Sequence, residues 1–407
     1  MTSNLSGRLH VIVPFVRRVF RENQCLYPLK KRIFSRKFSS AFLNRYQEDK
    51  YSELRNRLAA VPYLNLLDKE VDCVHHDLCN ENDERLKDAL KWCSKVFNYN
   101  ARSGKKIRAV ALLKAYCTYG FNIDDVAWKQ WDSDNWRSAV ILAWCIELLQ
   151  AYFIILDDIM DQSVLRRGEP CWYKKPDVGL CAINDALLLQ CGIYKLLQKH
   201  FVGSKCYTNV LHEFLKVTHE TVYGQCIDMM FNPINQKPSF DKFTFERYLT
   251  LTEYKTANYT FRLPVHLAMH LAGGYSINEF DFTRKLCLKL GLYFQSQDDR
   301  LDCFGKSEIT GKFGNDIREG KCTWFSVKFL EEAPESMKKI FLENYGVDDK
   351  DATAKVFELY RKANLLEKFE EFDAQLCTEI STLIESMNDI KGALFYDLFA
   401  QLRNREK

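Results

Sequence analysis

The sequence has little of what usually divides a chain into separate folding units. Its 407 residues include only 9 prolines and 17 glycines, and no linker rich in proline, glycine or serine follows residue 50. Alternating apolar and polar residues, the pattern of a half-exposed strand, are absent too. Apolar residues instead recur every three or four positions, interrupted by turn-forming residues at 100–104, 167–176, 232–238, 273–276 and 305–320. The sequence therefore predicts an all-α protein with one large helical domain, residues 46–407.

Charge and cysteine spacing exclude two further classes. The formal net charge is only +4, which gives no case for nucleic-acid binding. The 15 cysteines lack the spacing of a disulfide framework, which indicates buried thiols in a reducing compartment. One local group has side chains that bind zinc elsewhere but no CxxC pair, namely Cys73, His75, His76 and Cys79. We interpret that segment as a surface turn or a helix start.

Acidic residues are almost missing from the first 45 positions. This segment has ten lysines and arginines, including Arg17, Arg18 and Arg21, but Glu22 is its single acid. Basic, serine-containing and acid-poor sequence with interleaved apolar residues is typical of a mitochondrial presequence. The alternative is a disordered basic leader on a cytoplasmic protein. No secretory signal competes, because the apolar run is too broken.

Residues 139–156 form the longest apolar run. Glu147 and Gln150 interrupt it, and it continues directly into Asp157 and Asp158, which would be costly inside a bilayer. We therefore predict a helix buried on all sides and no transmembrane segment.

Two copies of one acidic pattern are the most informative feature. DDIMD and DDRLD supply Asp157, Asp158 and Asp161, and Asp298, Asp299 and Asp302. In a helix, positions i and i+4 share a face and i+1 lies about 100° round, so each motif should project a tight carboxylate cluster. A single such motif is often a solvated helix end, but each copy here follows an apolar run. Because Mg²⁺ binds carboxylates together with substrate phosphates, the pair predicts several Mg²⁺ ions and an anionic diphosphate between two facing helices.

Basic side chains flank the aspartates. Arg166 and Arg167 follow the first cluster, and GKKIR puts Lys105 and Arg108 on one helical face. Lysines also occur further along, at Lys255, Lys312 and Lys321. Each alone is more often solvated surface than a ligand, but arginine forks and lysine ammonium groups near carboxylate clusters favour phosphate binding.

From about Leu86 to the C-terminus the chain resembles the farnesyl diphosphate synthase family of short-chain trans-prenyltransferases. The strings that carry the resemblance are YNARSGKKIR, WCIELLQAYFIILDDIMDQSVLRRGEPCWY, GQCIDM, YKTANY, FQSQDDRLDCFG and TGKFGNDIREGKCTW. The resemblance implies an isoprenoid-synthase bundle with a central active-site cavity. It also implies isoprenyl diphosphate substrates, three Mg²⁺ ions per site and a homodimer.

The resemblance also implies roles for individual residues. All six aspartates would bind metal, and the catalytic group would be Asp157, Asp158, Lys255, Thr256 and Asp298. The allylic diphosphate would be held by Arg166, Lys255, Gln295 and Lys312. Isopentenyl diphosphate would be held by Lys105, Arg108, Gln150, Arg167 and the basic C-terminal end. Thr256, Gln225 and Asp228 would surround the reacting carbons and the first metal cluster.

Product length and reaction type leave alternatives open. In this family the residues four and five before the first aspartate form the pocket floor, here Phe153 and Tyr152. Two aromatics imply a farnesyl product, although tyrosine leaves a geranyl product open. Asn258 stands where an aromatic is usual, Arg262 lies one turn further on, and Ser296 and Arg300 replace more apolar residues. These departures leave open a terpene synthase that ionises one prenyl diphosphate. An inactive regulatory partner is disfavoured, because two unmetallated carboxylate clusters would repel.

Overall fold

A computed structural model describes residues 50–120, 134–233, 236–305 and 315–403 of the chain. The first half contains α3 (Tyr63–Cys79), α4 (Lys87–Asn100), α5 (Ile107–Gly120), α6 (Asp134–Met160), α7 (Ala182–Phe201) and α8 (Tyr207–Phe231). The second half contains α9 (Phe245–Leu251), a π-helical stretch η6 (Thr252–Arg262), α10 (Leu263–Ala272), α11 (Ile277–Phe304), α13 (Asp316–Glu319), α14 (Trp324–Glu332), α15 (Glu335–Asn344), α16 (Lys350–Lys362), α17 (Leu365–Glu385) and α18 (Asp389–Arg403). The all-α prediction is confirmed.

The turn predictions agree with the helix ends. α4 ends at Asn100, α8 at Phe231, α10 at Ala272 and α11 at Phe304. One feature was not predicted: the turn after α6 contains a short antiparallel hairpin of β1 (Leu165–Arg166) and β2 (Glu169–Pro170). The interpretation of residues 73–79 as a turn or helix start is wrong, because they form the C-terminal half of α3. Its periodic apolar side chains bury one face against α6 and outweigh the polar residues between them.

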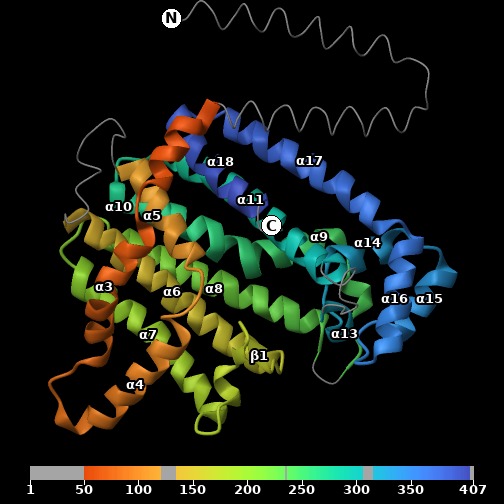
Figure 1. Ribbon diagram of the computed structural model, residues 1–407, viewed down its shortest axis with the longest axis horizontal. Helices are drawn as coiled ribbons and strands as arrows, with labels where there is room; N and C mark the ends of the chain where they lie inside the picture. Colours follow the sequence, from red (N-terminus) through yellow and green to blue (C-terminus); the bar gives the residue numbers. More distant parts are fainter. Residues whose placement is uncertain (1–49, 121–133, 234–235, 306–314, 404–407) are drawn as a thin grey trace, which may run out of the picture.

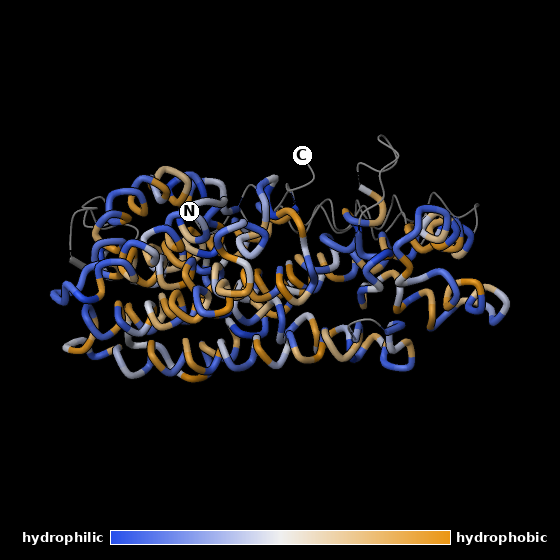
Figure 2. Tube along the Cα trace, turned by 90° about the horizontal axis from the view of Figure 1, so that it is seen from below, coloured by the Kyte–Doolittle hydropathy of each residue, from blue (hydrophilic) through white to orange (hydrophobic). Residues whose placement is uncertain are grey.

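Helix α6 forms the centre of the molecule, as expected for the longest apolar run (Figure 1). It packs against α7, α5 and α3, and Trp144, Leu148 and Leu149 are almost completely buried. By length and composition alone, residues 136–160 and 179–201 are apolar enough to cross a membrane. In the first of these, 78% of the most apolar window is buried inside the protein, as in the core helix of a folded domain. Figure 2 shows apolar residues concentrated along such inner helices.

The π-helical stretch η6 is held tightly between α8 and α11. At its end the amide of Leu263 donates to the carbonyl of Asn258, five residues back. A Cβ atom on Gly224 of α8 would lie 2.3 Å from the backbone nitrogen of Lys255. One on Gly291 of α11 would lie 2.1 Å from the Cβ of Ala257. Both approaches therefore require glycine. These close contacts fix the position of Lys255 and its neighbours between α8 and α11. π-Helical segments often occur at functional sites.

The C-terminal helices cover the other side of the bundle. α17 packs on α11 and α18, and α18 also contacts α5, as Figure 1 shows at the blue end of the chain. A buried ion pair of 2.6 Å between Lys114 and Asp397 joins α5 to α18. At the start of α11, Ser276 and Glu279 form a capping box. These contacts hold α11, which carries the second aspartate motif, at a fixed position relative to α6.

Candidate active site

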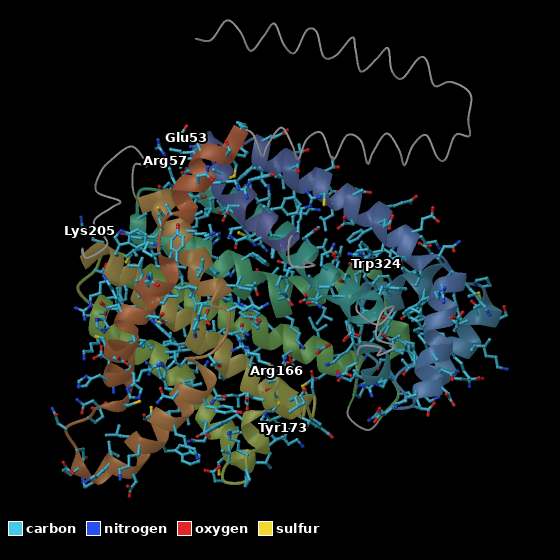
Figure 3. The ribbon with its side chains drawn as sticks, in the orientation of Figure 1. Glu53, Arg57, Arg166, Tyr173, Lys205 and Trp324 are labelled. Carbon is cyan, nitrogen blue, oxygen red and sulfur yellow. The ribbon has the colours of Figure 1, made fainter. Side chains whose placement is uncertain are left out.

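The three carboxylates of the first motif emerge at the C-terminal end of α6, and each contacts at least one cation; Arg166 reaches both Asp157, at 3.5 Å, and Asp158. Asp157 lies 3.2 Å from Lys255, and Asp161 lies 2.8 Å from Lys321. Asp158, only 2% exposed, accepts a 2.9 Å hydrogen bond from the Nε of Arg166, which Figure 3 labels in the hairpin after α6. Cations therefore already neutralise these carboxylates, and the described residues include no preformed metal cage.

Asp228 of α8 joins two of these cations. Its Oδ2 lies 2.5 Å from Lys255 Nζ and 3.5 Å from Lys321 Nζ. Burial opposes the charge of Asp228, but the two ammonium groups outweigh it and lower the carboxyl pKa. Conversely, burial disfavours the Lys255 cation, but Asp228, Asp157 and Asp161 together raise its pKa. The result is a chain of alternating charges from α6 through α8 and η6 to the turn before α14.

The second motif has a different environment. Asp299 is 2% exposed and accepts hydrogen bonds from the Tyr248 hydroxyl at 2.8 Å, the Trp324 amide at 2.8 Å and Gln295 Nε2 at 3.0 Å. Burial raises the pKa of Asp299 to about 7, while these three donors act in the opposite direction. Asp302 accepts hydrogen bonds from the amides of Asn315 and Asp316 at 3.1 and 3.0 Å.

Uncharged protein donors thus surround the buried carboxylate of Asp299, whereas Asp298 is half-buried. The metal assignment of both residues stays a prediction. Asp302 is also half-buried, and burial raises its carboxyl pKa despite the two backbone amides that bind it. Burial raises the pKa of Glu319 most, and Lys321 lowers it. Asp161 and Asp302 both raise it further. The two motifs therefore lie on either side of α13.

Within the described parts of the chain, no three acidic, histidine or cysteine side chains converge as a preformed metal cage. The donor set at the first motif nevertheless suits a hard cation. The buried Oδ1 of Asp157 accepts no hydrogen bond, and its neighbour Lys255 already provides positive charge there. Carboxylates that are spread apart and partly satisfied fit Mg²⁺, which takes one or two of them and completes its shell with water and phosphate.

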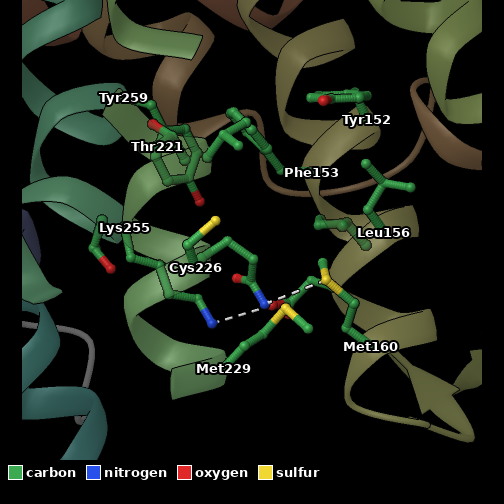
Figure 4. Close-up of a pocket in the computed structure, with 14 residues that line it drawn as sticks. Tyr152, Phe153, Leu156, Met160, Thr221, Cys226, Met229, Lys255 and Tyr259 are labelled. Carbon is green, nitrogen blue, oxygen red and sulfur yellow. Dashed lines mark hydrogen bonds and ion pairs between the residues drawn. The ribbon is translucent and has the colours of Figure 1, made fainter. Parts of the chain in front are cut away.

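An apolar pocket of about 290 Å³ opens beside the first motif (Figure 4). Its walls come from α6, α8 and η6, and its lining includes Tyr152, Phe153, Leu156, Met160, Thr221, Gln225, Met229, Thr256 and Tyr259. The Phe153 ring lies 4.9 Å from that of Tyr152 and 5.5 Å from that of Tyr259. Asp157 and Lys255 line the charged end of the pocket. Such a pocket fits an apolar chain with an anionic head.

A second pocket, of about 830 Å³, lies on the other side of α6. Its polar lining includes Lys105, Lys106, Arg108, Gln150, Asp158, Arg166 and Arg167. The buried Gln150 Oε1 accepts no hydrogen bond. Arg108 donates to the Tyr259 hydroxyl at 2.8 Å and to Thr260 Oγ1 at 2.9 Å. This concentration of cations around a large open volume fits a second anionic ligand.

Comparison with known proteins agrees with this geometry. Residues 90–363 match the polyprenyl synthetase family model. The farnesyl pyrophosphate synthase of Saccharomyces cerevisiae is 38% identical over 75% of this chain and 86% of its own length. The chain belongs to the farnesyl diphosphate synthase family. The farnesyl pyrophosphate synthase of Artemisia annua is 39% identical over 78% of this chain and 90% of its own length. The crystal structure of the T. brucei farnesyl diphosphate synthase has a TM-score of 0.75 at 29% identity, covering 84% of this chain and 99% of that one.

Most residues singled out from the resemblance to this family converge on the two pockets. Lys105, Arg108, Gln150, Arg166 and Arg167 share the basic pocket, and Tyr152, Phe153, Asp157, Gln225, Lys255 and Thr256 share the apolar one. Gln295 accepts a 3.0 Å hydrogen bond from Thr256. Lys312 and residues 404–407 lie outside the described residues. Residues 1–49, which include the leader, lie outside them as well.

Two functional features of this family member were missed. Lys106 lines the basic pocket with a buried side chain, and its ammonium group donates to the carbonyls of Ala101 and Ser103. GKKIR contains this lysine, but helical spacing pointed only to Lys105 and Arg108. The backbone of Gly104 was missed as a contact surface: a Cβ there would lie 2.4 Å from Arg167. Gly104 has a φ of +107°, a conformation that favours glycine. The glycine itself is therefore the signal that the sequence offers.

Two departures from the family pattern, Asn258 and Arg262, lie outside the lining of both pockets, whereas a third, Ser103, lines the basic one. Asn258 and Arg262 are each 1% exposed, and neither lines a pocket. Arg262 pairs with Glu220 of α8 at 2.7 Å, and His266 of α10 lies 2.8 Å from Glu213. A buried arginine is thus compensated by two carboxylates behind η6. This position gives these two departures no direct contact with a bound substrate.

Proposed function

We propose that this protein is a Mg²⁺-dependent trans-prenyltransferase that condenses dimethylallyl and geranyl diphosphate with isopentenyl diphosphate to give farnesyl diphosphate. The observation that carries the proposal is the pair of pockets on opposite faces of α6. They share Ile154, and Asp157 and Asp158 line one pocket each. An allylic substrate and a second diphosphate can therefore bind at once, with the helix end between their charged groups.

The basic pocket is the proposed isopentenyl diphosphate site. Arg108 and Arg167 offer planar donor forks to phosphate oxygens, and exposed Lys105 supplies a mobile charge. Arg108 currently donates only to hydroxyl groups, which exchange readily for phosphate. The unpartnered carbonyl oxygen of Gln150 provides a further polar contact. A terpene synthase, which needs no second diphosphate, has no use for this set of cations.

The apolar pocket is the proposed allylic site. Its aromatic floor would hold the prenyl tail, while Arg166, Lys255 and Lys321 would bind the diphosphate at the open end. In this structure those cations contact the aspartates directly. Bound Mg²⁺ would supply charge stabilisation for the pyrophosphate leaving group. Because the metal would take over the carboxylates, Lys255 and Lys321 would become free to donate to phosphate oxygens.

The reaction then follows from charge separation in a site that excludes water. The allylic C–O bond breaks, and Arg166, Lys255 and Lys321 stabilise the departing pyrophosphate. The double bond of isopentenyl diphosphate attacks the resulting allylic cation and forms the new C–C bond. A proton is then lost to pyrophosphate, which leaves a trans double bond. Thr256 lies at the wall of the apolar pocket, close to where this chemistry would occur. No side-chain nucleophile is needed.

The floor of the apolar pocket sets the proposed product length. Tyr152 and Phe153 pack against each other with tilted rings, about one helical turn below Asp157, and would stop the growing tail at farnesyl. Tyr152 is only 7% exposed and its ring fills part of the pocket end. Geranyl diphosphate as the final product is the near alternative, and product identification separates the two.

We further propose a homodimer formed through α7 and α8. These helices expose several large apolar side chains on the described surface, including Ile183, Leu187, Leu215, Tyr223 and Met230. Val222 and Met229, 39% and 38% exposed, belong to the same helix and also line the apolar pocket. A partner subunit covering them would shield the prenyl tail from water. Leu187→Glu should convert the dimer to a monomer in light scattering, whereas Gln198→Glu at another exposed position of α7 should not.

The leader is proposed to direct the protein to mitochondria. Residues 1–45 fused to a fluorescent reporter should localise there, and changing Arg17, Arg18 and Arg21 to acids should abolish import. Diffuse signal from the intact leader would support the cytoplasmic alternative.

The proposed reaction is tested by incubating the purified protein with Mg²⁺ and geranyl diphosphate, with and without isopentenyl diphosphate. We expect farnesyl diphosphate only when both substrates are present, with one isopentenyl diphosphate consumed per product. A hydrocarbon or alcohol released from geranyl diphosphate alone, faster than condensation, would favour a terpene synthase. No turnover under either condition would favour a regulatory partner.

A further inference from the structure

Two cysteines that the proposed reaction does not use lie side by side where α3 meets α4. Cys79 is the last residue of α3, and Cys93 lies in the middle of α4. Their sulfur atoms are 3.3 Å apart, and Cys79 donates a hydrogen bond to Cys93. A disulfide bond is about 2.05 Å long, so its formation needs an approach of only about 1.2 Å. Asn80, the next residue, is already extended, so Cys79 can shift without breaking the helix.

The surroundings of the two thiols favour oxidation by a small reagent. Cys79 is half-buried and Cys93 is 7% exposed, so a bulky oxidant has little access to Cys93. Lys195 of α7 lies close by and donates to the carbonyl of Leu78 at 3.3 Å. The hydrogen bond from Cys79 lowers the pKa of Cys93; burial opposes this effect, and Lys195 adds to it. Cys93 is therefore the more nucleophilic of the two sulfur atoms.

Cys93 belongs to the face of α4 that packs on α3. The two helices lie against each other at the orange end of the chain in Figure 1. On this face His75 of α3 hydrogen-bonds to Ser94 at 2.8 Å, and its ring lies 5.4 Å from the ring of Phe97. A bond between Cys79 and Cys93 would therefore draw this face of α4 closer to α3.

Another face of α4 holds the hairpin after α6. Tyr99 lies about 120° round the helix from Cys93, and its hydroxyl donates to the carbonyl of Pro170 at 2.6 Å. In the turn after α4, the carbonyl of Ser103 accepts a 3.1 Å hydrogen bond from Arg167. All four of these hairpin-contact residues line the basic pocket. The position of α4 thus determines how firmly the pocket wall that carries Arg167 is held.

Oxidation of the two thiols by a hydroperoxide balances without a further reagent. With hydrogen peroxide, the Cys93 thiolate attacks one oxygen, the O–O bond breaks, hydroxide leaves and Cys93 becomes a sulfenic acid. The Cys79 sulfur then attacks the Cys93 sulfur, loses its proton and displaces hydroxide, which forms the disulfide. Two thiols lose two electrons and two protons, and the peroxide is reduced to two water molecules. A thiol reductant reverses the change.

We propose that Cys79 and Cys93 form an oxidation site that a hydroperoxide converts to a disulfide, and that this disulfide weakens the basic pocket by drawing α4 toward α3. The shift lengthens the contact between Tyr99 and Pro170 and loosens the wall that carries Arg167. The effect on the pocket rests on the proposed function, because it treats the pocket as the isopentenyl diphosphate site. The oxidation site itself does not depend on that function.

The oxidation site is tested with the purified full-length protein and a small molar excess of hydrogen peroxide. After free thiols are alkylated, peptide mass spectrometry should find a cross-link between Cys79 and Cys93 that dithiothreitol removes. Oxidation should raise the melting temperature by about 2–5 °C, because the bond closes a loop between two helices. Cys79→Ser and Cys93→Ala should each abolish the cross-link and the rise. Cys181→Ser, which changes an exposed thiol, is the matched control and should keep both.

The effect on the pocket is measured by steady-state kinetics before and after oxidation. The KM for isopentenyl diphosphate should rise by about threefold or more, the order for weakening one polar contact, while the KM for geranyl diphosphate stays unchanged. Dithiothreitol should restore the original value. Cys79→Ser should show no such rise with peroxide. Cys226 is exposed and lines the apolar pocket, so its oxidation would appear instead as a raised KM for geranyl diphosphate, in wild type and variant alike.

Three results would overturn the inference. Oxidation of Cys181 or Cys226 without a cross-link between Cys79 and Cys93 would remove the oxidation site. A cross-link that leaves the KM for isopentenyl diphosphate unchanged would contradict the effect on the basic pocket. An equal response to peroxide in wild type and Cys79→Ser would assign that response to another thiol. Failure of the reduced wild type to condense the two substrates would instead contradict the proposed function, and the cross-link and melting temperature would still decide whether the oxidation site exists.

Discussion

The two faces of α6 offer opposite environments within a single helix. Tyr152, Phe153 and Asp157 line the apolar pocket, whereas Gln150 and Asp158 line the basic one. The helical period separates side chains that are neighbours in sequence, so consecutive residues serve different ligands. A single helix can therefore keep a prenyl tail and a second diphosphate apart while its C-terminal end brings their reacting groups together.

The paired aspartates at this end sharpen the contrast. Asp157 contacts Lys255 of η6 at 3.2 Å and is partly exposed. Asp158 contacts Arg166 of the hairpin and is buried. Arg166 also reaches Asp157 at 3.5 Å, so the two carboxylates of DDIMD share one cation, and only Asp157 contacts Lys255 as well. Substitutions on either side should separate metal binding, anion binding and tail length experimentally.

The largest effect is expected at the helix end itself. Asp157→Ala and Asp158→Ala should each lower turnover by about two orders of magnitude or more, because metal-assisted charge stabilisation is worth several kcal/mol. Steady-state assays over a range of Mg²⁺ concentrations measure the loss. Asp281→Ala, which removes an exposed acid from α11, is the matched control. Near-normal activity in both α6 variants would contradict the metal assignment.

On the basic face, Arg108→Ala should raise the KM for isopentenyl diphosphate by about tenfold or more, the usual order for losing a charge-assisted contact, while the KM for geranyl diphosphate changes little. Initial rates with each substrate varied in turn provide the comparison. Arg102→Ala is the control, because Arg102 is exposed, does not line the pocket and bonds to Asp72, which does not line it either. Equal increases in both KM values would mean that the two pockets are not separate sites.

On the apolar face, Phe153→Ala should lengthen the product beyond farnesyl, and Tyr152→Ala should act in the same direction. Each removes an aromatic ring from a closely packed pocket floor and leaves volume for the growing tail. Chromatography of the dephosphorylated products measures chain length. Phe280→Ala also removes a half-buried ring, but from outside both pockets, and should leave the products unchanged. An unaltered product from both floor variants would make these aromatics ordinary core residues.

The smallest effect is expected at the contact between α8 and η6, the stretch that contributes lining residues to both pockets. Gly224→Ala should lower the free energy of unfolding by about 1–3 kcal/mol, because the new Cβ overlaps the Lys255 backbone and forces α8 and η6 apart. It should also weaken allylic substrate binding through the displaced Lys255. Chemical denaturation and the KM for geranyl diphosphate test both effects. Gly203→Ala is the control, since a Cβ there meets nothing within 4 Å.

For the second motif, the sequence predicted individual ligands but not the helices that surround them. DDRLD matches DDIMD in spacing, so six equivalent metal ligands were predicted. In the structure, Asp299 is enclosed by Tyr248 and Trp324, which are distant in sequence. Spacing along a helix gives the direction of a side chain but does not identify the neighbouring helix it meets. The hydrogen-bond partners of Asp299 could therefore not be predicted from its motif.

By itself the sequence determined the all-α class and the buried helix α6, because apolar periodicity fixes which face of a helix is buried. The resemblance of its motifs to a known family gave most of the charged residues that line the two pockets. Tertiary structure alone decided which cation neutralises each aspartate, that Lys106 is turned inward, and that Arg262 lies behind η6 between Glu213 and Glu220. These outcomes depend on contacts between helices far apart in sequence, where small differences in burial and distance decide the free energy of a charge.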